Sequence, residues 1–164
     1  MNYFKDKNNE IFAFDDEQVA QGYAKGLTSI TKAEVDGLLA PTLAELKASK
    51  TSEINSACSK AITSGFTSSA LGTPHIYQSE QTDQLNLIGI VTAGQDDYFK
   101  CGVTDANGNI TWNYEMHTIA QLQQVLADGK AHKQVLLQKA NTLKVQVASA
   151  TTAAKVEAIV WSIA

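Results

Sequence analysis

Polar side chains of the kinds that do chemistry are concentrated in residues 71–89, LGTPHIYQSEQTDQLNLIG. Glu80 and Asp83 lie about one helical turn apart there, and a pair of carboxylates is what a glycosidase needs. The same two acids are also favourable at the start of a helix, where the helix dipole is positive. We predict this second role, in a strand-to-helix corner held together by polar side chains. Its members are His75, Tyr77, Asp83, Gln84 and Asn86.

The rest of the chain supplies no recognisable catalytic motif. The sequence contains neither a G-x-S-x-G nucleophile elbow nor a glycine-rich phosphate loop. The three histidines, His75, His117 and His132, fall on separate elements and lack a second ligand at helical spacing, although folding could still bring them together. We therefore expect no enzyme activity, no bound metal and no cofactor.

The charge of the chain argues against nucleic-acid binding. The net charge is −4, and all 13 basic residues are lysine, whereas arginine is the residue best shaped to bind phosphates and base edges. The charges are unevenly placed, because residues 80–115 are rich in acids and residues 129–164 in lysines. These segments are either ordinary solvated faces or an acidic and a basic surface that meet partners or each other.

The two cysteines, Cys58 and Cys101, have no CxxC or zinc-type spacing. We expect both to be free and buried, one on a helix and one in a strand. The opening MNYFKDKNNE is too polar for a signal peptide, and no apolar run reaches the roughly 18–20 residues that a membrane helix needs. We expect a protein that folds in a cytoplasm and has no membrane partner.

Residues 1–40 are predicted to form a small N-terminal module. The segments NYF and IFAF flank an Asn-rich turn, which is typical of a β-hairpin. Residues 15–26 follow as a short helix. A second helix begins at a T-x-x-E capping box formed by Thr31 and Glu34 and ends at Pro41.

A longer helix, about six turns, is predicted over residues 42–65, where it connects this module to the rest of the chain. Two short strands follow, in GFTSSAL and HIYQ. Ser79 is then predicted to cap a helix that starts at Glu80, sends Leu85 and Ile88 into the core and ends at Gly94. The apolar stripe of the longer helix is Leu43, Leu46, Ile54, Cys58 and Ile62.

A second hairpin and further helices complete the chain. The strands DYFKCGV and NITWNYEM flank Asn107-Gly108, a strong turn signal. Thr118 is predicted to cap a helix that breaks at Asp128-Gly129 and then resumes, and Thr151 to cap a last one. The helical stripes are Leu122, Val125 and Leu126, then Leu136, Ala140, Leu143 and Val147, and finally Val156, Ile159, Val160 and Ile163.

These elements predict an α+β protein. A small hairpin–helix module over residues 1–40 precedes a domain over residues 41–164, in which short antiparallel strands pack on several helices. Tight turns between neighbouring strands disfavour a parallel βαβ sheet.

Several motifs resemble known phage proteins. GFTSSALG, PHIYQ, DQLNLIG and HTIAQLQQVLADGKAH together resemble a domain of unknown function that recurs in proteins from bacteriophage tail-gene clusters, over roughly residues 42–161. The layout MNYFKD…NEIFAFDD…GL…IT…E is similar to the start of phage tail fibre assembly proteins. The resemblance carries no catalytic residues.

The resemblance implies a tail fibre assembly factor, a chaperone that binds a fibre or receptor-binding protein while that protein folds or trimerises in the host cytoplasm. Many assembly proteins continue differently after this start, so a structural tail-tip or fibre-associated subunit retained in the virion tail is the alternative. A homo-oligomer through the Ala-rich C-terminal helices also stays open. The predicted partner contacts, each also a candidate for the module's own core, are Tyr3, Phe4, Phe12 and Phe14.

Overall fold

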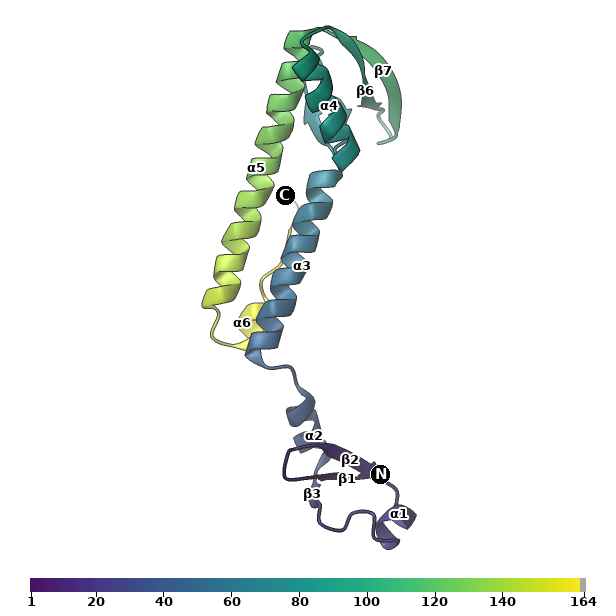
Figure 1. Ribbon diagram of the computed structural model, residues 1–164, viewed down its shortest axis with the longest axis vertical. Helices are drawn as coiled ribbons and strands as arrows, with labels where there is room; N and C mark the ends of the chain where they lie inside the picture. The colour runs from purple at the N-terminus through teal and green to yellow at the C-terminus, as the bar shows by residue number, and fades with distance from the viewer. Residues whose placement is uncertain (163–164) are drawn as a thin grey trace. The chain divides into compact units, whose positions relative to one another are not determined.

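The computed structural model describes residues 1–162, which fold into two compact units, one over Met1–Glu45 and one over the described residues from Leu46 onward. Figure 1 shows helices together with two separate sheets, and each strand pair in the described residues is antiparallel. The predicted α+β class is therefore confirmed. We name the two parts the N-terminal unit and the C-terminal unit.

The N-terminal unit holds a three-stranded sheet and two short helices. Its elements are β1 (Asn2–Lys5), β2 (Ile11–Phe14), α1 (Asp16–Ala20), β3 (Thr28–Ile30) and α2 (Lys32–Leu39). The β1–β2 hairpin is confirmed, whereas β3 was not predicted, and the strand order is β2-β1-β3. The helix predicted over residues 15–26 ends at Ala20, and the turns after it use positive φ angles of 87° at Gly22 and 84° at Gly26.

The β1–β2 and β6–β7 hairpins close with loops of the same construction. In each loop the carboxylate of the first residue, Asp6 or Asp105, accepts the backbone N–H groups two and four residues later at 2.8 and 2.9 Å. The fourth residue lies in the left-handed region, with φ of 63° at Asn9 and 85° at Gly108. Hydrogen bonds from Asn109 also lower the pKa of Asp105 below its usual value.

We expect Asn9→Ala to weaken the first hairpin by about 1 kcal/mol, because alanine adopts the left-handed conformation less readily than asparagine does. Asn9→Gly should keep or raise its stability, since the second loop already has glycine there. Hydrogen exchange at the amides of β1 and β2 measures the difference. Equal exchange rates in the alanine variant and the parent would contradict the prediction.

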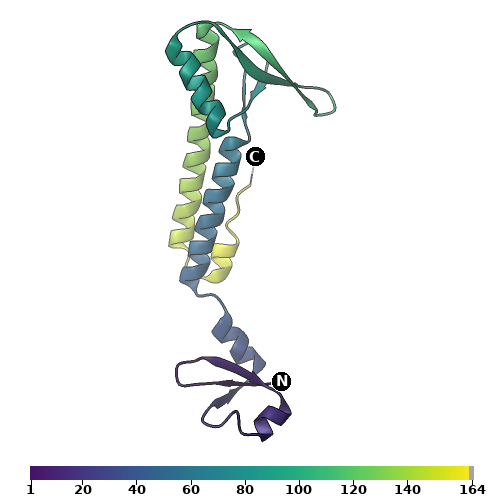
Figure 2. The same ribbon diagram turned by 45° about the vertical axis from the view of Figure 1, so that its right-hand side comes forward.

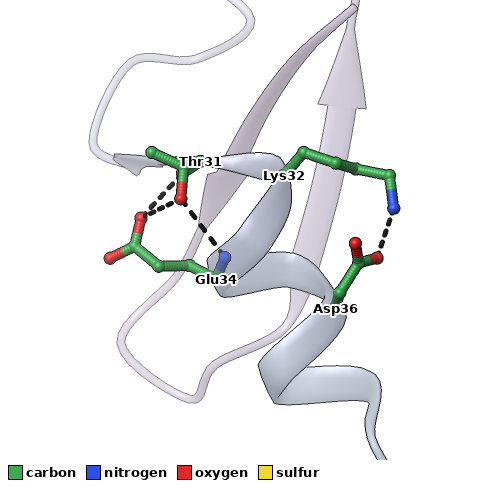
Figure 3. Close-up of polar contacts among 4 residues, drawn as sticks. All are labelled: Thr31, Lys32, Glu34 and Asp36. Atoms are coloured by element: carbon green, nitrogen blue, oxygen red, sulfur yellow. Dashed lines mark hydrogen bonds and ion pairs between the residues drawn. The ribbon is translucent and has the colours of Figure 1, made fainter.

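Helix α2 begins at the predicted capping box, drawn in Figure 3. The Thr31 hydroxyl accepts the N–H of Glu34 at 3.2 Å, and the Glu34 carboxylate accepts the N–H of Thr31 at 2.7 Å. This backbone hydrogen bond, helped by one from the Thr31 hydroxyl, holds the pKa of Glu34 below its usual value. Lys32 and Asp36 form an ion pair across the next turn.

The C-terminal unit combines a four-stranded sheet with long helices. In Figures 1 and 2, α3 and α5 run side by side, and α4 lies against the N-terminal half of α5. The strand order is β4-β5-β6-β7. The elements are α3 (Leu43–Thr63), which starts just before the boundary, β4 (Phe66–Ser68), β5 (His75–Tyr77), α4 (Gln81–Ala93), β6 (Asp97–Thr104), β7 (Ile110–His117), α5 (Ile119–Ser149) and α6 (Ala153–Glu157).

One face of this sheet packs on α4 and α5 and forms the first core cluster. The rings of Phe66, Tyr77 and Phe99, from three adjacent strands, stack with centroid distances of 5.7 and 6.1 Å. Cys101 is buried beside them, and burial raises the pKa of its thiol. Cys58 and Cys101 are both free and buried, as predicted. The buried members are Phe66, Tyr77, Leu87, Phe99, Cys101, Leu122 and Val125.

Helix α4 presents a different face to the core from the predicted one. Leu87 is the buried residue of this helix, whereas Leu85 is 60% exposed and Ile88 is 47% exposed. The prediction was wrong because apolar residues occur on nearly every side of this helix, so that spacing alone does not identify its buried face. The predicted cap was also one residue early, since Glu80 rather than Ser79 is the N-cap. Gly94 ends the helix with a φ of 72°, as predicted.

Helix α5 runs through the predicted break at Asp128-Gly129 without interruption. Gly129 does not end the helix; it leaves room for the ring of Phe66. A Cβ built on Gly129 would lie 2.7 Å from the tip of that ring, which is closer than real atoms approach. The predicted cap was correct, because Thr118 accepts the N–H of Gln121 and that side chain reaches back to the Thr118 N–H.

The C-terminal half of α3 and the C-terminal half of α5 form the second core cluster, which α6 and the chain after it adjoin (Figure 2). The predicted stripes are buried here at Ile54 and Cys58 on one helix and at Ala140 and Val147 on the other. Thr152, not Thr151, caps α6. Ile159 packs against the cluster, Val160 is 60% exposed, and Ile163 lies outside the described residues.

Candidate functional site

The N-terminal sheet gathers three of the four predicted partner contacts on one face. The register pairs Phe4 with Phe12 and Asn2 with Phe14, which places the three phenylalanines on the same side. Phe14 lies 5.9 Å from Phe4 and 6.3 Å from Phe12, between ring centroids. Tyr23 packs against Phe14 with the two rings tilted and their centroids 6.1 Å apart, and is itself 60% exposed. We call these four residues the phenylalanine face.

Tyr3 lies on the opposite face of the same sheet, where it pairs with Ile30 of β3. Ile30 and Val35 are the two buried apolar side chains of the described N-terminal unit. The small core of this unit therefore lies on the side of Tyr3. On the other side, the phenylalanines are only half-buried, so a continuous aromatic surface stays in reach of a partner.

The predicted corner has a buried centre. Tyr77 and His117 are both fully buried, and the Tyr77 hydroxyl lies 2.9 Å from His117 Nε2. His117 Nδ1 lies 2.8 Å from the carbonyl oxygen of Glu115, which only accepts, so Nδ1 donates. In the neutral imidazole Nε2 then accepts the Tyr77 hydroxyl proton, and both polar groups are satisfied. Burial raises the pKa of Tyr77 well above its usual value.

Asp83 and Gln84 form hydrogen bonds at the start of α4, the structural role predicted for them in the corner. The Asp83 carboxylate accepts the N–H of Glu80 at 3.0 Å, and the Gln84 amide donates to the Ser79 carbonyl at 2.9 Å. Lys133 of α5 also donates to Gln84 at 3.3 Å. Asn86, by contrast, is exposed, and its side chain forms no hydrogen bond with another described residue.

His75 is separate from this centre. It is half-buried in β5, and its Nδ1 lies 2.8 Å from the Thr73 carbonyl oxygen. His132, the third histidine, stacks on Phe66 at 6.4 Å. The three histidines therefore have different partners. Residues 1–162 contain no cluster of three or more His, Cys, Asp and Glu that could hold a metal ion.

The carboxylates near the corner mostly serve backbone amides. Asp96 accepts the N–H of Ile119, the first residue of α5, at 2.7 Å, and Asp97 accepts the N–H of Tyr98 at 2.7 Å. Asp83 is used in the same way at α4. These contacts stabilise helix starts and strand ends.

Two cavities flank α4, and Asp83 borders both of them. The first, about 380 Å³, opens between α4 and β6–β7 and is lined in part by Asn86, Tyr98 and Tyr114. The second, about 330 Å³, lies between α4 and α5 and is mostly apolar. Its wall includes Phe66, Leu87, Leu126, Gly129, His132 and Lys133. The corner predicted from sequence thus forms one wall of each cavity.

Sequence reasoning missed one buried polar contact next to the second cavity. Ser68 of β4 is buried, and its hydroxyl donates to Asp128 of α5 at 2.6 Å. Asp128 also accepts from Gln124 at 2.7 Å. Because Asp128 stands next to Gly129, the sequence suggested that a helix ends there. In the structure Asp128 instead links α5 by a hydrogen bond to β4, an edge strand of the sheet.

None of the helices within residues 1–162 combines the length and the apolar composition that a bilayer span requires. A family model described as "Domain of unknown function (DUF4376)" matches residues 45–160, most of the C-terminal unit. The chain has no match among curated proteins or among solved structures.

Proposed function

This chain belongs to the DUF4376 family of domains of unknown function, and we propose that it is a non-enzymatic assembly factor for a bacteriophage tail fibre. It binds a fibre or receptor-binding protein in the host cytoplasm while that protein folds or trimerises. The observation that supports this proposal most directly is the phenylalanine face, since apolar side chains grouped on a small exposed sheet are typical of protein–protein contact.

The physical need for such a helper follows from the nature of fibres. Intertwined β-rich trimers have many contacts between residues far apart in sequence, so they fold slowly and expose strand edges and apolar surface while they do so. A small protein that covers this surface suppresses aggregation. The N-terminal unit offers aromatic rings for that purpose, and the C-terminal unit supplies most of the stable core.

We expect co-expression with the neighbouring fibre gene to raise the yield of soluble, detergent-resistant fibre trimer. Deletion of residues 1–40 should remove most of this gain, because it removes the phenylalanine face. The deletion retains the Thr42–Glu45 hydrogen bonds that start α3, so residues 42–164 should stay folded. Gel electrophoresis without boiling measures the trimer, and circular dichroism checks the fold.

A matched pair of point variants sharpens this test. Tyr23→Ala removes an exposed ring that packs against Phe14, whereas Leu39→Ala removes an apolar side chain of α2 that is 68% exposed and outside the phenylalanine face. Tyr23→Ala should lower the trimer yield and Leu39→Ala should not. Equal trimer yield with and without this gene would reject the assembly role. Mass spectrometry that then finds the protein in purified virions would assign it to the alternative, a structural tail subunit.

A further inference from the structure

The outer edge of β7 is a long strand edge that no described residue pairs with. β7 is the last strand in the order β4-β5-β6-β7, and β6 is its one hydrogen-bonded neighbour in the described chain. It has 8 residues, whereas β4, at the other edge of this sheet, has 3. Natural edge strands are usually short or blunted by lysine, proline or a bulge. β7 is long and contains no lysine, proline or bulge, Glu115 is its one acidic residue, and its register with β6 runs unbroken from His117 to Ile110.

The hydrogen bonds of the hairpin show which backbone groups are free. The N–H of Asp105 donates to the carbonyl of Asn109 at 2.9 Å, which makes this pair a hydrogen-bonded one. Hydrogen-bonded and non-hydrogen-bonded pairs alternate along an antiparallel ladder. Thr111, Asn113, Glu115 and His117 therefore bond to β6. The residues whose N–H and C=O groups point to the open edge are Ile110, Trp112, Tyr114 and Met116.

The same four residues form an apolar row on one face of the hairpin. Tyr114 is 68% exposed, Met116 51% and Ile110 41%, while Trp112 is half-buried beneath Lys100, whose ammonium lies 5.4 Å from the indole. On the other face, Thr111, Asn113 and Glu115 are also exposed. Neither face of β7 is thus covered enough to block a strand that approaches its edge.

We infer that β7 pairs antiparallel with β7 of a second copy of this chain, in a register centred on Asn113, and joins the two sheets into one. This register sets Trp112 opposite Tyr114 of the second copy and Ile110 opposite Met116 of the second copy, so all four outward-facing residues are paired. A register centred on Tyr114 would instead set Ile110 opposite Thr118, whose N–H already donates to Gln121.

The charge pattern of β7 also favours pairing with a second copy of this chain. Glu115 is the one acidic residue of β7, and the proposed register places it opposite Thr111 of the second copy. No like charges therefore face each other across the new interface, and aromatic and aliphatic side chains meet on the other face, which is the pairing that stabilises antiparallel strands.

Paired charge variants test both the interface and its register. Ile110→Lys with Met116→Lys places like charges opposite each other across the twofold axis, whereas Ile110→Lys with Met116→Glu places opposite charges there. Within one chain the residues directly opposite these positions are uncharged, Thr104 and Tyr98, and the charged diagonal neighbour of position 116 on that face is Lys100. Circular dichroism must therefore show that both variants keep the fold of the parent. Sedimentation equilibrium over a concentration series should show a dimer for the parent. The Lys–Lys variant should dissociate on the order of tenfold more readily, and the Lys–Glu variant should remain dimeric.

Hydrogen exchange supplies a readout that does not depend on the variants. In the parent, the amides of Trp112 and Tyr114 should become protected as the protein concentration rises, while those of Asn113 and Glu115 stay protected throughout, because they bond to β6. A parent that is monomeric at every concentration would overturn the inference and leave the edge to a strand from another protein. A Lys–Lys variant that dimerises like the parent, or a folded Lys–Glu variant that is monomeric, would also overturn it.

Discussion

Gly129→Leu should lower the free energy of unfolding by about 3 kcal/mol, because it forces a side chain into the space that the Phe66 ring occupies. A Cβ at this position would lie 2.7 Å from one ring atom and 2.9 Å from another. Phe66 is buried and stacks on both Tyr77 and His132, so its ring can move aside only by giving up those contacts. Thermal or urea unfolding followed by circular dichroism measures the loss.

Gly89→Leu is the matched control for this substitution. Gly89 also lies inside a helix, α4, but a Cβ there has no neighbour within 4 Å. Leucine is a better helix former than glycine, so the free energy of unfolding of this variant should rise by up to about 1 kcal/mol. Equal losses in both variants would mean that Gly129 is needed for some reason other than contact with Phe66.

The second large effect is expected at the buried pair of Tyr77 and His117. His117→Ala should lower the free energy of unfolding by about 3–5 kcal/mol. It leaves a cavity beside two aromatic rings and removes the hydrogen-bond partner of the Tyr77 hydroxyl. Tyr77→Phe should cost less, about 1–3 kcal/mol, because it keeps the ring and loses only the hydrogen bond to Nε2. Urea unfolding of both variants gives the two values. Full stability of Tyr77→Phe would show that the hydrogen bond is not made.

The same pair predicts a pH dependence. Burial raises the pKa of Tyr77 in the folded protein above its value of about 10 in the unfolded chain. Above pH 10 the unfolded chain loses this proton first, so the contribution of Tyr77 to stability is complete below that pH and declines as the pH rises. The slope approaches 1.4 kcal/mol per pH unit. Tyr77→Phe should remove this part of the alkaline loss, and an identical alkaline profile for parent and variant would contradict the assignment.

Local sequence signals predicted those elements whose causes are themselves local. The two hairpins follow from turn residues next to alternating apolar residues, and the caps at Thr31 and Thr118 follow from side chains three residues apart. β3 escaped prediction because three residues carry no periodicity, and it forms only by pairing with β1. The break predicted at Gly129 was wrong because this glycine does not end the helix. It makes room for the ring of Phe66, which comes from another part of the chain.

The candidate sites likewise combine features that local sequence predicts with features that depend on packing between distant segments. The phenylalanine face could be approached from sequence, since aromatic residues flank a turn and Tyr3 and Phe4, as neighbours in one strand, must point to opposite faces. The register with β2 is what places Phe12 and Phe14 on the side of Phe4 rather than of Tyr3. The residues of the corner were named from their polarity, whereas the cavities beside them exist only because α4 packs between β6–β7 and α5. The partner of His117 lies 40 positions away in the chain, a separation that no short motif can encode.

Helix α5 takes part in both core clusters of the C-terminal unit, with Leu122 and Val125 in one and Ala140 and Val147 in the other. Its 31 residues correspond to about 46 Å of rigid backbone. One residue inserted between the clusters would turn one of them by about 100° relative to the other, and would move the contact with Phe66 out of line with the contacts to α3. Insertions and deletions between the clusters are therefore tolerated only when the number of residues is close to a whole number of helical turns. Helix α3 must also lengthen or shorten by the same amount, so that its contacts with α5 are kept.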